Sequence, residues 1–312
     1  MHCKLLKNKA RRIAESLLSL AITSGLVMAA EGPDIRISAP SLGWILAADG
    51  SQAIEITGIT DSPRTGRAVA LADIARRAWA SPDATAVVLQ TGMGIALLRG
   101  NEQAENLLAL PAGSAASIAW DRASAGFAVC WDTFCEARGA NGAMRARWEV
   151  AGGTRILAYS ADNGLLLATA ESAEWRREST AVTLDAIPAA AAFRPGTSEL
   201  WLLDAAGQLT GIDPQRRPVG AAELVPNALG LVASLDGKSF FAANAEGATA
   251  TTNLETLQTE KSNLEDSVEG LWPAAGRFTV RLHDSAKRAI AIWNGDSGIT
   301  GWVPALNSEV RQ

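Results

Sequence analysis

The sequence predicts an all-β protein, a β-propeller of seven blades that are each a four-stranded antiparallel sheet. Very little of residues 31–312 shows the 3.6-residue periodicity of helices. Short apolar runs of five to seven residues dominate instead, separated by Gly, Asp, Asn, Ser and Pro. These runs recur with a period of about forty residues, the length of one four-stranded blade.

Each repeat unit is anchored by one large apolar residue; the anchors are Trp79, Trp120, Tyr159, Phe193, Val232 and Trp272. Successive anchors are 41, 39, 34, 39 and 40 residues apart. A polar turn and a second apolar run follow each anchor, and Asp-Gly turns suit tight hairpins because they accept positive φ. An aromatic anchor before such a turn is expected to pack between blades, so we interpret these tryptophans as core residues rather than as a ligand cradle.

Six units span about residues 73–307, and residues 35–72 contain the further strand-like runs Ile35–Ser38, Trp44–Ala48 and Ala53–Ile59. These runs predict a seventh blade, with a strand from the other terminus as one way to complete it, because closure removes exposed sheet edges. Six blades with an N-terminal extension is the alternative. Thr60–Arg67 and Ser262–Glu269 are expected to be variable loops. Nothing in composition divides residues 31–312, so we predict one domain.

Residues 1–30 have the parts of a secretory signal peptide. Five basic residues open the chain: Lys4, Lys7, Lys9, Arg11 and Arg12. The apolar run Leu17–Met28 follows and is shorter than the roughly 20 residues that span a bilayer. Val27-Met28-Ala29 supplies small residues for cleavage. We predict a secreted or periplasmic protein that is not inserted in a membrane after cleavage; an uncleaved anchor is the alternative.

Removal of the leader changes the charge balance. Residues 1–29 carry five of the 28 Lys and Arg and one of the 33 Asp and Glu, which leaves 23 basic and 32 acidic residues, a formal net charge of −9. A surface of that sign repels phosphate backbones, so nucleic-acid binding is disfavoured.

Two cysteines remain in the mature chain, Cys130 and Cys135. Two short strands joined by the four-residue loop Trp131–Phe134 would place them opposite each other, within disulfide reach. An even count in an oxidising compartment favours this bridge. A metal site is the alternative, but two thiols with His283 far away in sequence make a poor zinc set.

The turn Ser234-Leu235-Asp236-Gly237-Lys238, followed by Phe241-Ala242-Ala243-Asn244, resembles the repeats of bacterial exported β-propellers of the YVTN/WD40-like type. Ser81-Pro82-Asp83 is a partial match, and the other units keep the pattern of apolar and turn positions. The resemblance implies a fold and leaves the activity open, because unrelated functions share propellers.

Residues for catalysis are sparse. His283 is the one histidine outside the leader, and it stands beside Asp284 where the second strand of its unit leads to the third. No nucleophile motif accompanies it, so an exposed loop histidine is expected. The starts of the inner strands are mostly small and apolar, and Asp73, Asn227 and Glu269 are the remaining candidates for a lactonase-like metal site.

Two functions are therefore considered. The first is an exported, non-enzymatic platform that binds a protein, peptide or glycan in the envelope, as a monomer and without metal or cofactor. Its predicted contacts are Trp131, at a hairpin tip outside the aligned aromatic positions, with His283 and Asp284; the alternative for Trp131 is that it folds back onto its own blade. The second is a small-molecule hydrolase or lyase with its site at the mouth of the central channel. Polar side chains that converge on the channel mouth would favour the enzyme. An apolar, alanine-lined mouth would favour the platform.

Overall fold

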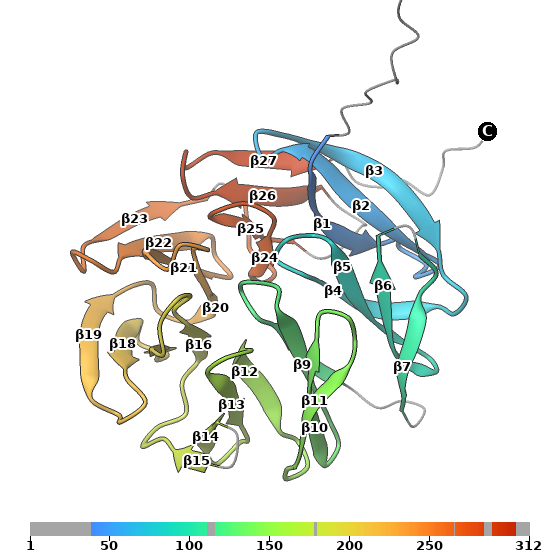
Figure 1. Ribbon diagram of the computed structural model, residues 1–312. Helices are drawn as coiled ribbons and strands as arrows, with labels where there is room; N and C mark the ends of the chain where they lie inside the picture. The colour runs from blue at the N-terminus through green and yellow to red at the C-terminus, as the bar shows by residue number, and fades with distance from the viewer. Residues whose placement is uncertain are drawn as a thin grey trace, which may run out of the picture. The chain divides into compact units, whose positions relative to one another are not determined.

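The computed structural model describes residues 39–100, 102–110, 116–177, 180–264, 266–283 and 289–303. Over these residues the chain forms seven antiparallel sheets arranged in a ring (Figure 1). The predicted seven-bladed propeller is confirmed, and the six-bladed alternative is wrong. The leader and the run Ile35–Ser38 lie outside the described residues. No described helix has the length and apolar character to cross a membrane.

The strands follow the chain blade by blade. The first three blades comprise β1 (Ser41–Leu46), β2 (Gln52–Ile59) and β3 (Ser62–Ala70); β4 (Ala75–Ala80), β5 (Ala86–Thr91), β6 (Gly94–Arg99) and β7 (Glu105–Ala109); β8 (Ala116–Trp120), β9 (Gly126–Trp131), β10 (Phe134–Gly139) and β11 (Met144–Glu149). The fourth and fifth comprise β12 (Arg155–Ser160), β13 (Gly164–Ala168), β14 (Ala173–Arg177) and β15 (Thr180–Thr183); β16 (Ala190–Phe193), β17 (Leu200–Leu203), β18 (Gln208–Ile212) and β19 (Pro218–Glu223). The sixth and seventh comprise β20 (Ala228–Ala233), β21 (Ser239–Asn244), β22 (Ala248–Asn253) and β23 (Thr259–Asn263); β24 (Trp272–Ala274), β25 (Thr279–Arg281), β26 (Ile290–Asn294) and β27 (Thr300–Val303).

Position in the blade explains the composition of each strand. In the second to seventh blades the first strand is innermost, and successive inner strands such as β12, β16 and β20 contact one another around the ring centre. The second strand is covered on both faces by neighbouring blades, so it is apolar at nearly every position, as in β5. The outermost strand is mostly exposed and polar, as in β11.

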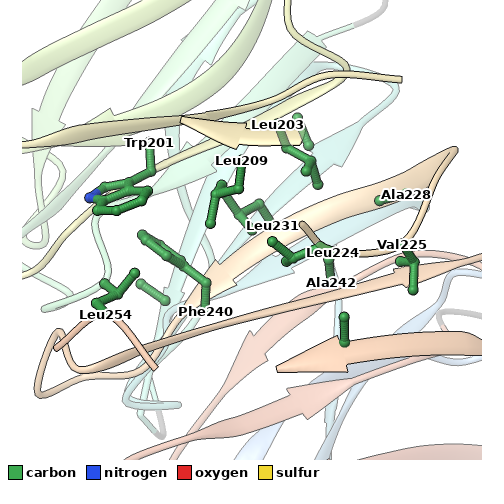
Figure 2. Close-up of a cluster of buried hydrophobic side chains, with 13 residues drawn as sticks. Trp201, Leu203, Leu209, Leu224, Val225, Ala228, Leu231, Phe240, Ala242 and Leu254 are labelled. Atoms are coloured by element: carbon green, nitrogen blue, oxygen red, sulfur yellow. The ribbon is translucent and has the colours of Figure 1, made fainter. Parts of the chain in front are cut away.

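The core lies between blades rather than within them, because each sheet buries its faces only against its neighbours. Figure 2 shows one such layer, between the fifth and sixth blades. Trp201 and Phe240 face each other there with ring centroids 5.6 Å apart, and Leu203 and Leu231 belong to the same cluster. Similar apolar clusters lie between the other blades, which hold the ring together as one unit.

The first blade differs from the others because it has three described strands. In the second, fifth and sixth blades, a leucine after the outermost strand donates its N–H to the turn between the second and third strands: Leu110 to Met93, Leu224 to Gly207 and Leu264 to Gly247. Leu71, after β3, makes the same bond to Ser51 in the turn between β1 and β2. The strands β1, β2 and β3 therefore take the second, third and outermost positions, and no described strand takes the innermost one.

The ring closes where the seventh blade packs on the first, with β27 beside β3 (Figure 1). Asn294 Nδ2 donates to Thr60 Oγ1 at 2.8 Å. Gly301 lies so close to the carbonyl of Thr60 that a side chain there would collide with it. Among the described residues the two blades exchange no strand, unlike the closure we considered from the sequence.

One predicted loop is a strand. Thr60–Arg67 was expected to be irregular, but β3 begins at Ser62 and pairs with β2 along its length. An outermost strand packs on one neighbour only and needs no apolar run, so the pattern that identifies inner strands is missing there. Ser262–Glu269 agrees better with expectation, since β23 ends at Asn263.

Candidate functional site

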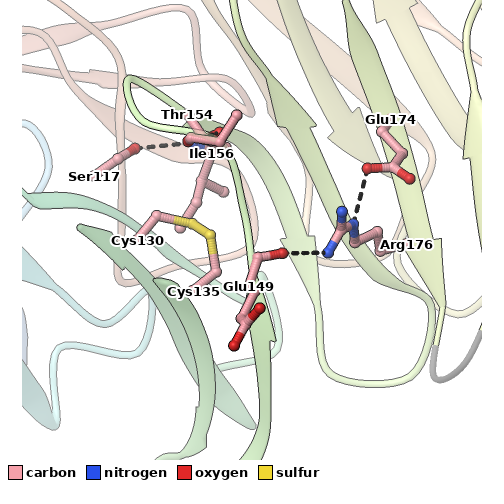
Figure 3. Close-up of a disulfide and its surroundings, with 9 residues drawn as sticks. Ser117, Cys130, Cys135, Glu149, Thr154, Ile156, Glu174 and Arg176 are labelled. Carbon is pink, nitrogen blue, oxygen red and sulfur yellow. Dashed lines mark hydrogen bonds and ion pairs between the residues drawn. A yellow bond between two sulfur atoms is a disulfide. The ribbon is translucent and has the colours of Figure 1, made fainter. Parts of the chain in front are cut away.

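The disulfide between Cys130 and Cys135 is present, as predicted (Figure 3). The two cysteines are direct cross-strand partners in β9 and β10, with Cα atoms 4.0 Å apart. The connecting turn is shorter than expected, because Trp131 and Phe134 also pair across the strands. Both cysteines are buried against Tyr159 of the fourth blade, so the bridge lies at a blade interface.

Trp131 is not the exposed aromatic that we expected. It ends β9, is only 8% exposed, and belongs to the apolar cluster between the second and third blades. The Arg147 guanidinium lies 4.1 Å from the ring of Phe134 and 5.9 Å from that of Trp131 and helps to cover both. The signal in the sequence was the unbroken apolar run Gly126–Trp131, which is typical of a second strand rather than a hairpin tip.

His283 lies between β25 and β26, as the repeat predicts, but it is 1% exposed and so is not an exposed loop residue. Its Nε2 is 2.7 Å from the carbonyl oxygen of Ser267 and its Nδ1 is 3.0 Å from that of Ala289. The Ser267 contact ties the seventh blade to the segment that follows β23 of the sixth, and the Ala289 contact lies within the seventh blade. Asp284 lies outside the described residues, so its role as a binding contact stays a prediction.

The three candidates for a lactonase-like site are distributed over separate loops. Asp73 accepts a hydrogen bond from the backbone N–H of Met93 at 3.0 Å. Asn227 adopts a positive φ of 53°, and its N–H donates to the carbonyl of Ala205. The Glu269 N–H donates to the carbonyl of Leu282. Within the described part of the chain, no three His, Cys, Asp or Glu side chains form a group that could hold a metal ion.

The ring centre contains a partly open pocket of about 250 Å³. Residues on or next to the inner strands of six blades line it, and the first blade contributes none. Its aromatic residues are Trp79, Trp120, Tyr159, Phe193 and Trp272, and alanines fill much of the remaining wall. The three tryptophans are half-buried, and Trp79 and Trp120 both line the channel and pack against the cluster between the second and third blades.

Arg122 is the charged residue among those that line this pocket. It follows β8 in the third blade and reaches across the ring to the sixth and seventh. Its Nε donates to the carbonyl of Ala233 at 2.8 Å, and its Nη2 lies 3.2 Å and 3.3 Å from the carbonyls of Gly276 and Arg277. Burial lowers the pKa of Arg122 to about 10, against the opposing effect of Asp121 and Asp236. Sequence analysis missed this residue, because no local pattern places it in the channel.

Two large apolar side chains are exposed where the first and second blades meet. Ile74 is 62% exposed and Met93 is 68% exposed. The bond from the Met93 N–H to Asp73 joins their two loops. Arg76 and Arg77 are also exposed at the start of β4, and no ion pair to either is formed within the described ranges. We call Ile74, Arg76, Arg77 and Met93 the blade-two patch.

Comparison with known proteins identifies the fold and no family. No family model matches the chain, and no curated protein matches it. Three solved structures with similar folds share little sequence. A functionally unknown protein from Desulfotomaculum acetoxidans DSM 771 has 11% identity and a TM-score of 0.57, over 84% of this chain and 94% of that one. BBS1N, solved in complex with ARL6DN and soaked with lead, has 14% identity and a TM-score of 0.51, over 88% and 94%. Apo AztD from Citrobacter koseri has 10% identity and a TM-score of 0.53, over 86% and 96%.

Proposed function

We propose that this protein is an exported, non-enzymatic platform that binds a protein partner in the cell envelope. The central pocket has apolar, alanine-rich walls, which is the arrangement that favours a platform over an enzyme. The buried Cys130–Cys135 disulfide fits an oxidising compartment. The similar structure of BBS1N was solved in complex with another protein.

The blade-two patch carries the proposal. Ile74 and Met93 expose apolar side chains on loops tied together through Asp73, so they would lose little entropy on binding. Apolar contacts of this kind, with arginine beside them, are characteristic of protein interfaces. Arg76 and Arg77 add positive charge to a chain that is acidic overall. The partner that fits is a protein segment with acidic and apolar side chains.

A capture experiment with the full mature protein tests this. Envelope extract is passed over wild type, over Ile74→Asp/Met93→Asp, and over Met144→Asp as a control for an added charge at another exposed apolar position. We expect a partner that wild type and the control retain and that the double variant loses. Arg76→Ala/Arg77→Ala should slow association of the partner with the patch. It should also make the association rate depend less on salt concentration. If the double variant retains the partner as well as wild type does, the blade-two patch is not the binding surface.

Two further measurements address location and activity. N-terminal sequencing of exported protein should begin at Ala30 or Glu31, and an intact Met1 on the soluble mature protein would exclude cleavage. Turnover of a lactone or ester that is abolished by changing Asp73, Asn227 or Glu269 would establish the enzyme alternative instead.

A further inference from the structure

The channel pocket presents an arginine that makes no direct ion pair with the residues that the structure describes. The hydrogen-bond acceptors of Arg122 are the neutral carbonyls of Ala233, Gly276 and Arg277. No carboxylate oxygen of the described residues forms an ion pair with it. The charges of Asp121 and Asp236 offset only part of the cost of burying this guanidinium, and an anion bound in the pocket would offset more of it. Burial also lowers its pKa to about 10, which leaves the group charged at neutral pH.

One nitrogen of Arg122 is available for a ligand. Nε and Nη2 are committed to backbone carbonyls, whereas Nη1 makes no hydrogen bond to the residues that the structure describes. Because the two committed nitrogens fix the plane of the guanidinium, the N–H groups of Nη1 have a defined direction. An arginine held in this way is suited to a carboxylate, with which it forms charge-assisted hydrogen bonds.

The remaining wall suits a flat apolar group. Trp79, Trp120 and Trp272 line the pocket with half-buried rings, and Ala119 and Ala192 leave space between them. The volume of about 250 Å³ is near the lower end of small-ligand pockets, so it admits a compact molecule and excludes a polymer chain.

From these observations we propose that the channel binds a small aromatic carboxylate, with its carboxylate at Nη1 of Arg122 and its ring among the channel tryptophans. The site is separate from the blade-two patch, so the two proposals stand or fall independently. Burial of the ligand's aromatic ring among the tryptophans favours binding, and the charge of Arg122 selects the acid over its neutral analogues.

Phenylacetate and its neutral analogue phenylacetamide provide the test, with binding to the mature protein followed by calorimetry and tryptophan fluorescence. We expect phenylacetate to bind about tenfold or more tightly than the amide, because the amide cannot form charge-assisted bonds. Arg122→Met should weaken phenylacetate binding by about tenfold and remove the preference for the acid. Arg64→Met, which removes an exposed arginine on β3, should change neither.

A second variant keeps the test decisive if Arg122→Met fails to fold. Ala192→Phe fills the channel and leaves Arg122 in place, so it should abolish binding of both compounds while the protein stays folded. The proposal is overturned if wild type binds neither compound or binds both equally. It is also overturned if folded Ala192→Phe still binds phenylacetate as wild type does.

Discussion

The side chain of Arg281 donates from Nη1 to the backbone carbonyl of Trp44 at 2.6 Å, joining residues 237 positions apart. Trp44 is in β1, which forms the inner edge of the first blade among the described residues. The N–H of Ala275 meets the carbonyl of Leu42 on the same edge at 3.0 Å. Two groups of the seventh blade thus bond to carbonyls on an edge of β1 that no described strand pairs with. Arg281 is buried, and its guanidinium lies 5.1 Å from the ring of Trp272.

Arg281→Met should destabilise the ring, because it keeps much of the side-chain volume but leaves the Trp44 carbonyl without this donor. Loss of a buried hydrogen bond to a charged group costs about 1.5–3 kcal/mol. Urea unfolding of the full mature protein measures the change. Arg64→Met is the control for removing an arginine, and equal stability of the two variants would show that Arg281 does not hold the closure.

The Asp121 carboxyl should make stability fall as pH rises. Burial raises its pKa above the ordinary value of 3.8, with a contribution from Asp162, and outweighs the hydrogen bond from the Ala125 N–H. A folded-state pKa above the unfolded one means that the folded protein holds this proton more tightly, so ionisation of Asp121 costs stability. Asp121→Asn should therefore stabilise the protein at pH 7.

The stabilisation by Asp121→Asn should shrink as the pH is lowered through the raised pKa toward 3.8. Urea unfolding at several pH values tests this. At each pH, the free energy of unfolding of wild type is subtracted from that of the variant. The exposed Asp61→Asn controls for the loss of one negative charge. A difference that does not change with pH would contradict the assignment to Asp121.

Removing the disulfide should weaken the protein without unfolding it. The bridge closes a short loop, with a sequence separation of 5, so chain-entropy models give it about 2 kcal/mol. Because both cysteines are buried, we expect no alkylation of the folded protein and a mass two hydrogens below that of the reduced chain. Cys130→Ala/Cys135→Ala should lower the free energy of unfolding by this amount, seen as a lower urea midpoint. Two thiols that alkylate freely in the native protein would contradict the bridge.

Trp131→Ala should be strongly destabilising, because this side chain is buried rather than exposed at a hairpin tip. Removing a buried tryptophan typically costs about 3–5 kcal/mol. Trp302→Ala, at an aromatic residue that remains 43% exposed on β27, is the control and should cost much less. Thermal unfolding of both variants gives the comparison, and equal melting temperatures would mean that Trp131 is not packed as described.

The sequence was informative where a strand is covered on both sides. The second strands, such as β5 and β9, contain continuous apolar runs, and their period of about forty residues, together with the runs in residues 35–72, predicts seven blades. The position of β3 could not be predicted in this way, because an outermost strand carries no apolar signal. His283 is likewise buried against a residue outside its own strand pair, since its Nε2 contacts the carbonyl of Ser267 in the segment between the sixth and seventh blades.

The candidate sites were harder to predict because they depend on residues far apart in the chain. Arg122 reaches the channel through an acceptor 111 positions away, and nothing around residue 122 indicates such a partner. The cysteines were predictable because the hairpin between them is local. The blade-two patch was not, since Ile74 and Met93 meet through two separate loops.

Because the donors that complete β1 come from Ala275 and Arg281, the ring is finished late in the synthesis of the chain. The edge of β1 is synthesised early, and its donors become available only when the last blade has been made. This long sequence separation between bonded residues favours slow folding. During that interval the edge of β1 is a template on which a strand of another chain can pair. Aggregation during production should accordingly rise on truncation at the C-terminal end, because a deletion that removes Arg281 removes its bond to the edge of β1.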